Sequence, residues 1–175
     1  DDSGRHPEEG GSDLWKMYKR TMDIAEKLTG YVLYILVGFM VVVVFLQVIF
    51  RFILHASLPW SEEASRYIMV WLSMLGAGIG LRRKGHIGVE ALTMLFPKHL
   101  KRATAVFGSL VAILFCCGLI LYGVRLLRVV AAQESPAMEI SMAIPYGALV
   151  AGGTLMLFYA LEAMLLQLRG EESSL

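Results

Sequence analysis

The chain has 175 residues, of which 57% are hydrophobic and 18% are charged. A soluble domain of this length carries more charged and fewer apolar residues, so the composition favours an integral membrane protein over a soluble domain. The net charge of +1 excludes little as a sum, because the information lies in how the charges are distributed along the chain.

The N-terminal region differs in composition from the rest of the chain. Residues 1–12 are rich in Gly, Asp and Glu without an apolar pattern, which is typical of a disordered tail. A helical pattern starts at Asp13, and residues 13–29 mix basic and aromatic side chains. We expect a cytoplasmic or interfacial helix there, although a soluble leader fits the pattern as well. No cleavable signal peptide is expected, because the first apolar run is too long for one.

Four apolar segments predict a four-span membrane domain over residues 30–168. The segments are residues 30–50, 62–81, 103–127 and 143–166. Each approaches the roughly 20 apolar residues that a membrane-spanning helix needs. Ser61 is expected to cap the second span, and Pro145 falls in the first turn of the fourth, where its missing N–H costs little. The expected fold is all-α, and residues 169–175 form a short tail.

A short segment between the second and third spans has an amphipathic pattern. The apolar side chains that fall on one side of it are Ile87, Ala91, Leu92 and Leu95, and Pro97 ends the segment. We expect an interfacial amphipathic helix over residues 85–96 that lies flat on the membrane, with an exposed loop as the alternative.

Lysine and arginine predict the orientation. Of the 16 such residues, twelve lie before the first span, between the second and third spans, or after the fourth, and four lie in the first and third loops. The positive-inside rule therefore places both termini in the cytoplasm and the Trp60 turn outside. The run Arg82, Arg83 and Lys84 ends the second span, and we expect it to bind anionic lipid headgroups at the cytoplasmic face.

Several function classes lack the residues they need. A proton-coupled antiporter needs an ionisable group deep in a span, but the first span offers only Gln47, and Glu162 lies near the cytoplasmic end of the fourth, where it can pair with lysines at the interface. A haem anchor needs axial histidines inside the bundle, and all four histidines lie outside the spans. We expect no enzyme activity, no cofactor or metal, and no nucleic-acid partner.

Four charged residues surround the turn between the first and second spans. They are Arg51, Glu62, Glu63 and Arg66. The arginine at residue 51 ends one helix and the two acids begin the next, so each sign suits its helix dipole. We expect a balanced charge cluster that fixes the hairpin, with contact to a substrate or ion as the alternative.

One face of the second span carries small residues. Gly76 and Gly80 form a G-x-x-x-G pair, which allows close contact with another helix. The pattern does not distinguish a partner's helix from a helix of this chain.

Spaced residues between Phe45 and Pro97 form a family pattern. They are Gln47, Arg51, Leu58-Pro59-Trp60-Ser61-Glu62-Glu63, Arg66-Tyr67, Trp71, Gly76-Ala77, Arg82 and Gly85-His86-Ile87-x-Val89-Glu90. The pattern resembles the small membrane subunit of tripartite ATP-independent periplasmic (TRAP) transporters, the DctQ type. Ile144-Pro145-Tyr146-Gly147 extends the resemblance, more weakly, over residues 28–168. Position 90 carries Glu where many relatives carry Asp.

The resemblance implies a bacterial or archaeal inner-membrane protein that pairs with a larger multi-span subunit. In that family the large subunit holds the substrate and sodium sites, and a periplasmic binding protein delivers an organic acid such as a dicarboxylate, a sugar acid or a sialic acid. The small subunit then serves as static scaffold, with structural or partner-interface roles. The residues expected in these roles are Gln47, Arg51, Trp60, Glu62, Glu63, Arg66, Trp71, Gly76, Gly80 and His86. The alternative is a self-contained four-span transporter or channel that acts as a homo-oligomer.

Overall fold

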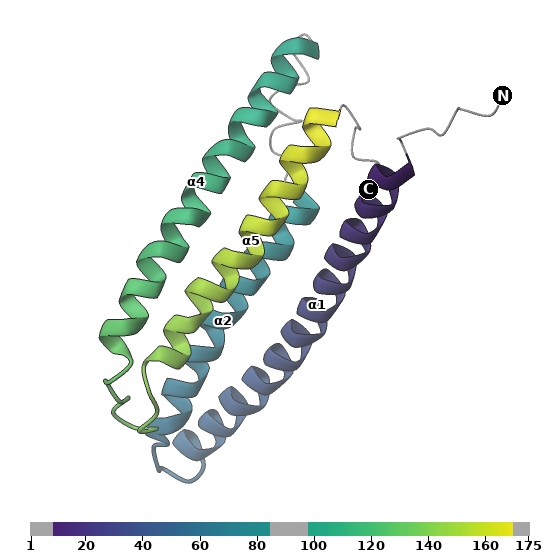
Figure 1. Cartoon of the computed structure of the whole chain (residues 1–175). Helices are drawn as coiled ribbons and strands as arrows, with labels where there is room; N and C mark the ends of the chain where they lie inside the picture. The colour runs from purple at the N-terminus through teal and green to yellow at the C-terminus, as the bar shows by residue number, and fades with distance from the viewer. Residues whose placement is uncertain (1–8, 85–97, 170–175) are drawn as a thin grey trace, which may run out of the picture.

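The computed structural model describes residues 9–84 and 98–169, and its regular secondary structure over these ranges is helical (Figure 1). The helices are α1 (Glu9–Phe52), α2 (Pro59–Lys84), α4 (Lys98–Val130) and α5 (Ala143–Arg169). Each contains a segment long and apolar enough to cross a membrane. These segments are Met17–Phe52, Pro59–Arg83, Ala103–Val130 and Ala143–Leu168. The prediction of an all-helical chain with four apolar, membrane-length helices is confirmed.

The first helix is longer than the sequence predicts. It runs from Glu9 to Phe52 without a break, so the expected interfacial helix at 13–29 and the first span are one continuous element. At about 1.5 Å per residue, the 44 residues of α1 extend about 66 Å, more than twice the roughly 30 Å hydrocarbon layer of a bilayer. At ordinary helix tilts, part of α1 therefore lies outside that layer. The amphipathic helix predicted at residues 85–96 lies outside the described residues.

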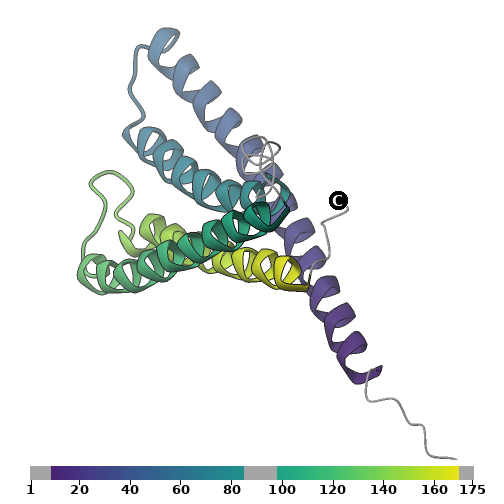
Figure 2. The ribbon, with the colours of Figure 1, turned by 90° about the horizontal axis from the view of Figure 1, so that it is seen from above.

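The helices form a row, not a closed bundle. The extensive contacts join α4 to α5, α5 to α2, and α2 to α1. Figure 1 shows α4 and α1 at the two edges of the row with α5 and α2 between them, and in the view from above α4 crosses α5 at an angle (Figure 2). In α5, 33% of the most apolar segment is buried, against 6% in α1. The packed core of the chain therefore lies along α5 and the face of α2 that it contacts.

Glycines allow α5 to approach both of its neighbours closely. A Cβ atom added to Gly152 would lie 2.7 Å from the Cβ of Met74 on α2, and one added to Gly153 would lie 3.1 Å from a methyl carbon of Leu119 on α4. A Cβ atom on Gly76 or Gly80 would meet no atom within 4 Å among the described residues. The close helix contacts among the described residues therefore use other glycines than the predicted pair.

The loops at residues 53–58 and 131–142 lie at the same end of the row, here called the loop end (Figure 1). The first leads directly into α2, which starts with Pro59, a residue suited to the first helical position because its φ angle is already fixed. Ser61 is therefore inside the first turn, where its hydroxyl donates to the carbonyl of Leu58 at 2.7 Å. The prediction that Ser61 caps α2 is wrong for this reason.

Candidate functional site

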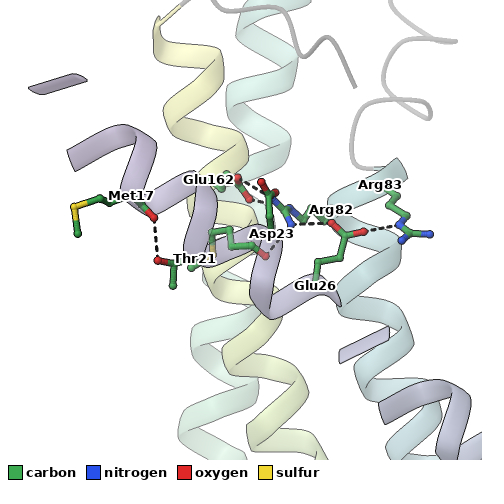
Figure 3. A network of polar contacts seen from close by, with 8 residues as sticks. Met17, Thr21, Asp23, Glu26, Arg82, Arg83 and Glu162 are labelled. Atoms are coloured by element: carbon green, nitrogen blue, oxygen red, sulfur yellow. Dashed lines mark hydrogen bonds and ion pairs between the residues drawn. The ribbon is translucent and has the colours of Figure 1, made fainter. Parts of the chain in front are cut away.

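The guanidinium of Arg82 lies near the end of α2 among acidic residues from two other helices (Figure 3). Its nitrogens lie 2.5 Å from an oxygen of Asp23, 2.7 Å from Glu26 and 3.2 Å from Glu162. Nη1 also donates to the backbone carbonyl of Met22 at 2.8 Å. Only 8% of the Arg82 side chain is exposed. One buried cation thus joins α1, α2 and α5.

Two further side chains complete this group. The Arg83 guanidinium, 69% exposed, lies 2.6 Å from the second carboxylate oxygen of Glu26. The ring of Tyr159 on α5 is buried, and the Arg82 guanidinium carbon lies 5.3 Å from its centroid, within range of a cation–π interaction. We call this group, formed by Asp23, Glu26, Arg82, Arg83, Tyr159 and Glu162, the Arg82 cluster.

The chemistry of the Arg82 cluster fits a structural joint between helices. A guanidinium presents five N–H donors in a planar fork, so it can bind several carboxylates at once, which a lysine ammonium does less well. Glu162 is also buried, with a side chain 8% exposed, and a buried carboxylate is costly without a cation beside it. Within the residues described, the carboxylates do not form a group that could hold a metal ion. The arrangement therefore stabilises the contact of α1 with α2 and α5.

The position of the Arg82 cluster can be inferred from helix spacing and from distance to the turn, although not from the charge pattern alone. Asp23 and Glu26 are three residues apart and so share one face of α1. In an antiparallel hairpin, residues equally far from the turn lie at the same level. Glu26 is 26 residues before the end of α1, and Arg82 is 23 residues after the start of α2, so the two lie at nearly the same level.

The sequence pattern groups Arg82 with Arg83 and Lys84 as lipid-binding residues. In the structure, carboxylates of the same chain surround Arg82, whereas Arg83 keeps a largely exposed guanidinium. The side chain of Lys84 lies outside the described residues. Lysines at the interface are the expected partners of Glu162, but its cationic partner is Arg82. Lipid contact by this basic run stays a prediction.

At the loop end, Glu63 joins the start of α2 to the 131–142 loop. Its carboxylate accepts hydrogen bonds from the backbone N–H of Ala137 at 3.2 Å and of Met138 at 3.1 Å. The residue is 5% exposed. Two backbone donors satisfy this buried anion, as a buried polar group requires.

The balanced charge cluster expected at this end does not form. No ion pair within the described part of the chain connects Arg51, Glu62, Glu63 and Arg66 to one another. Arg51 is exposed at the end of α1, and the Nε of Arg66 donates to the backbone carbonyl of Glu62 at 3.3 Å, not to its carboxylate. The carboxylate of Glu63 binds the loop backbone instead, and the side chain of Glu62 is exposed.

The remaining predicted residues have separate positions. The indole of Trp71 donates to the carbonyl of Ile144 at 3.2 Å and so contributes to the α2–α5 contact. Trp60 is exposed at the loop end, and Gln47 is half-buried on α1. His86 lies outside the described residues. A role in binding a partner stays a prediction for all of these positions.

Comparison with known proteins adds to this geometry. Residues 40–170 match the family model for tripartite ATP-independent periplasmic transporters, DctQ component. A sialic acid TRAP transporter permease protein, SiaT, from Haemophilus influenzae is 30% identical over 79 residues, which is 45% of this chain and 13% of the relative. The C4-dicarboxylate TRAP transporter small permease protein DctQ from Vibrio cholerae is 26% identical over 99 residues, 57% of this chain and 41% of the relative.

A third relative matches over more of its length. A putative TRAP transporter small permease protein from Haemophilus influenzae is 23% identical over 141 residues, which is 80% of this chain and 85% of the relative. The matches to SiaT and to the Vibrio protein span less than two thirds of those relatives. The family model covers most of this chain and agrees with its four apolar helices. The chain therefore belongs to the DctQ family of TRAP transporter small membrane subunits, which are multi-pass proteins of the bacterial inner membrane and not enzymes.

Proposed function

We propose that this chain is the scaffold subunit of a sodium-coupled TRAP transporter that imports an organic acid. In this proposal it acts with a large multi-span membrane subunit and a periplasmic binding protein. The observation that carries the proposal is the free face of α2. A Cβ atom added to Gly76 or Gly80 would meet no atom of the described chain within 4 Å, although both glycines suit a close helix contact.

The shape of the row supports a membrane partner. On α2, Ser73 and Ala77 are exposed beside the two glycines, so the free face is shallow and allows another helix to approach its backbone. In addition, the stretch similar to this chain makes up only 13% of the SiaT permease protein, so such a stretch occurs within a much longer permease chain. Both observations favour a large membrane protein as the occupant of this face.

The distribution of charged residues along the chain favours a transport path in another subunit. The apolar segments contain no charged residue between Lys27 and Arg51, between Arg66 and Arg82, or between Ala103 and Val124. In the last segment the charged residue is Glu162, near the end of α5. Ion-coupled transport needs polar or ionisable groups along the path, so we assign the sodium and solute sites to the large subunit. The named solutes of the relatives, sialic acid and C4-dicarboxylates, are both carboxylic acids, which supports the organic-acid class.

Leucine substitutions on the free face of α2 test whether a partner helix binds there. We expect Gly80→Leu or Gly76→Leu to reduce co-purification with the cognate large subunit several-fold, because the side chain blocks close approach of the partner helix. The thermal stability of the isolated chain should change little, since the Cβ atom of the new side chain meets no described atom within 4 Å. The measurement is the yield of 1:1 complex in mild detergent, beside the melting temperature of each purified variant.

Two matched variants control this experiment. Gly38→Leu places the same side chain on open space on α1 and should leave the complex intact, whereas Gly152→Ala should lower the stability of the chain itself, because its Cβ meets Met74. Normal complex yield for both α2 variants would mean that this face contacts lipid. A stable homodimer together with solute uptake by the pure chain in proteoliposomes would favour the self-contained transporter.

The proposed orientation places both termini in the cytoplasm and the loop end in the periplasm. We expect single cysteines at Ser57 and Lys98, introduced after removal of Cys116 and Cys117, to differ in labelling by a membrane-impermeant maleimide. Residue 57 should react in intact spheroplasts, and residue 98 only after lysis. Labelling of residue 98 in intact spheroplasts would reverse the orientation.

A further inference from the structure

An apolar groove of about 410 Å³ runs along α4 beside α5. Its lining extends along α4 from Leu114 to Leu126, and Leu149 contributes from α5. At about 1.5 Å per residue, this stretch of α4 is about 18 Å long, comparable to the roughly 15 Å depth of one leaflet of the hydrocarbon layer.

The missing side chain of Gly118 opens the hollow, whereas Gly123 lets α5 approach α4, since a Cβ atom there would lie 3.0 Å from a methyl carbon of Val150. Gly118 and Gly123 both line the hollow, and a Cβ atom added to Gly118 would meet nothing within 4 Å. An α-helix with its side chains is about 10 Å wide, whereas a single hydrocarbon chain, which carries no side chains, is roughly half as wide. A hollow opened by one absent side chain on one helix therefore suits an acyl chain better than a transmembrane helix.

A positive charge lies at the end of the groove nearest the loop end. The guanidinium carbon of Arg125 is 5.6 Å from the ring centroid of Tyr122, which lines the groove, so a cation–π interaction holds the charge beside the groove lining. Both side chains are exposed, and no carboxylate of the described residues forms an ion pair with Arg125. Tyrosine and arginine near the end of a membrane-spanning helix are typical of the headgroup region, where a guanidinium can bind two phosphate oxygens at once.

We propose that this groove is a binding site for an anionic phospholipid of the leaflet at the loop end. One acyl chain lies along α4 between Leu114 and Leu126, and the phosphate accepts hydrogen bonds from Arg125. The charge complementarity at Arg125 and the match between groove length and leaflet depth select this occupant. The site does not depend on the proposed transport function, because it lies on α4 and α5 and the glycine pair lies on α2.

Native mass spectrometry of the purified full chain tests the site, with dioleoyl-phosphatidylglycerol and uncharged dioleoylglycerol titrated separately. We expect wild-type protein to retain one phosphatidylglycerol. Gly118→Leu should abolish retention by filling the groove, and Arg125→Gln should weaken it about tenfold by removing the charge-assisted hydrogen bonds. Gly108→Leu, on open space on the same helix outside the groove, and Arg128→Gln, an exposed arginine one turn further, should retain lipid as the wild type does.

Three outcomes would overturn the proposal. They are equal retention of the charged and uncharged lipids, unchanged retention in Gly118→Leu, and equal weakening by Arg125→Gln and Arg128→Gln. A Gly118→Leu protein that keeps its lipid but loses the large subunit would show that a protein helix occupies the groove. If Gly118→Leu does not fold, the comparison of the two arginine variants still decides the question, because both side chains are exposed.

Discussion

Replacement of Arg82 by alanine should lower the free energy of unfolding by about 3–5 kcal/mol, which is the range for removing one partner of a buried ion pair. The side chain is 8% exposed and lies within 3.2 Å of carboxylate oxygens from Asp23, Glu26 and Glu162. Without the guanidinium, Glu162 remains buried beside other anions. The measurement is unfolding of the purified chain in mixed micelles, with disulfide cross-linking between α1 and α2 as a second readout of helix contact.

Arg83→Ala is the matched control for this experiment. It removes an arginine from the next position, but that side chain is 69% exposed, so its ion pair with Glu26 contributes at most about 1 kcal/mol. Arg82→Lys should fall between the two, because an ammonium keeps the charge without the planar fork. The double variant Arg82→Met with Glu162→Gln should recover part of the loss, since no unpaired buried charge remains on α5. If Arg82→Ala and Arg83→Ala lowered the free energy of unfolding equally, Arg82 would not be the residue that joins the three helices.

Replacement of Glu63 by glutamine should free the 131–142 loop from α2 and destabilise the chain by about 2–3 kcal/mol, the range for hydrogen bonds to a charged group and for the donors left unpaired. The amide keeps the shape of the side chain, but its NH₂ group would face the backbone N–H of Ala137 or Met138. We expect faster hydrogen exchange at these two amides and faster proteolysis within the loop.

The neighbouring acid and the nearby arginine provide the controls. Glu62→Gln changes an exposed carboxylate in the same turn and should leave both the loop exchange and the stability nearly unchanged. Arg51→Ala should also have a small effect, because Arg51 is exposed and forms no ion pair with Glu62 or Glu63 in the described structure. If Arg51→Ala destabilises the chain as much as Glu63→Gln, the charges act as the balanced cluster that the sequence suggests.

The number and approximate position of the spans can be predicted, because the thickness of the bilayer fixes the length of an apolar segment and the sequence states that length directly. Preferences for residues at helix ends are also predictive. The sequence places Pro145 in the first turn of the last span, and in the structure α5 starts at Ala143, so Pro145 lies in its first turn. The family can also be recognised, since its spaced residues are local in sequence.

The contacts between helices cannot be predicted in the same way. Gly152 approaches Met74 because α5 packs on α2, and nothing in the order of the chain states that the last helix inserts between α4 and α2. The partner of Glu162 escapes prediction for the same reason, because Arg82 is 80 residues away in the sequence. The charge pattern assigns Glu63 to nearby arginines, whereas its actual partners are backbone N–H groups, which carry no signal in a residue pattern.

The row of helices has a mechanical consequence. A layer one helix thick has no second layer behind it, so rotation of one helix pair against the next, about an axis parallel to the helices, is opposed by contacts between neighbouring helices and, at one end, by the Arg82 cluster. Sliding of the helices along their axes is different, because Arg82 ties three of them at one end and Glu63 ties α2 to the loop before α5 at the other. The isolated subunit should therefore change its curvature more readily than its helices slide along one another. A partner surface that binds the whole row would fix one curvature and so make the row of helices rigid.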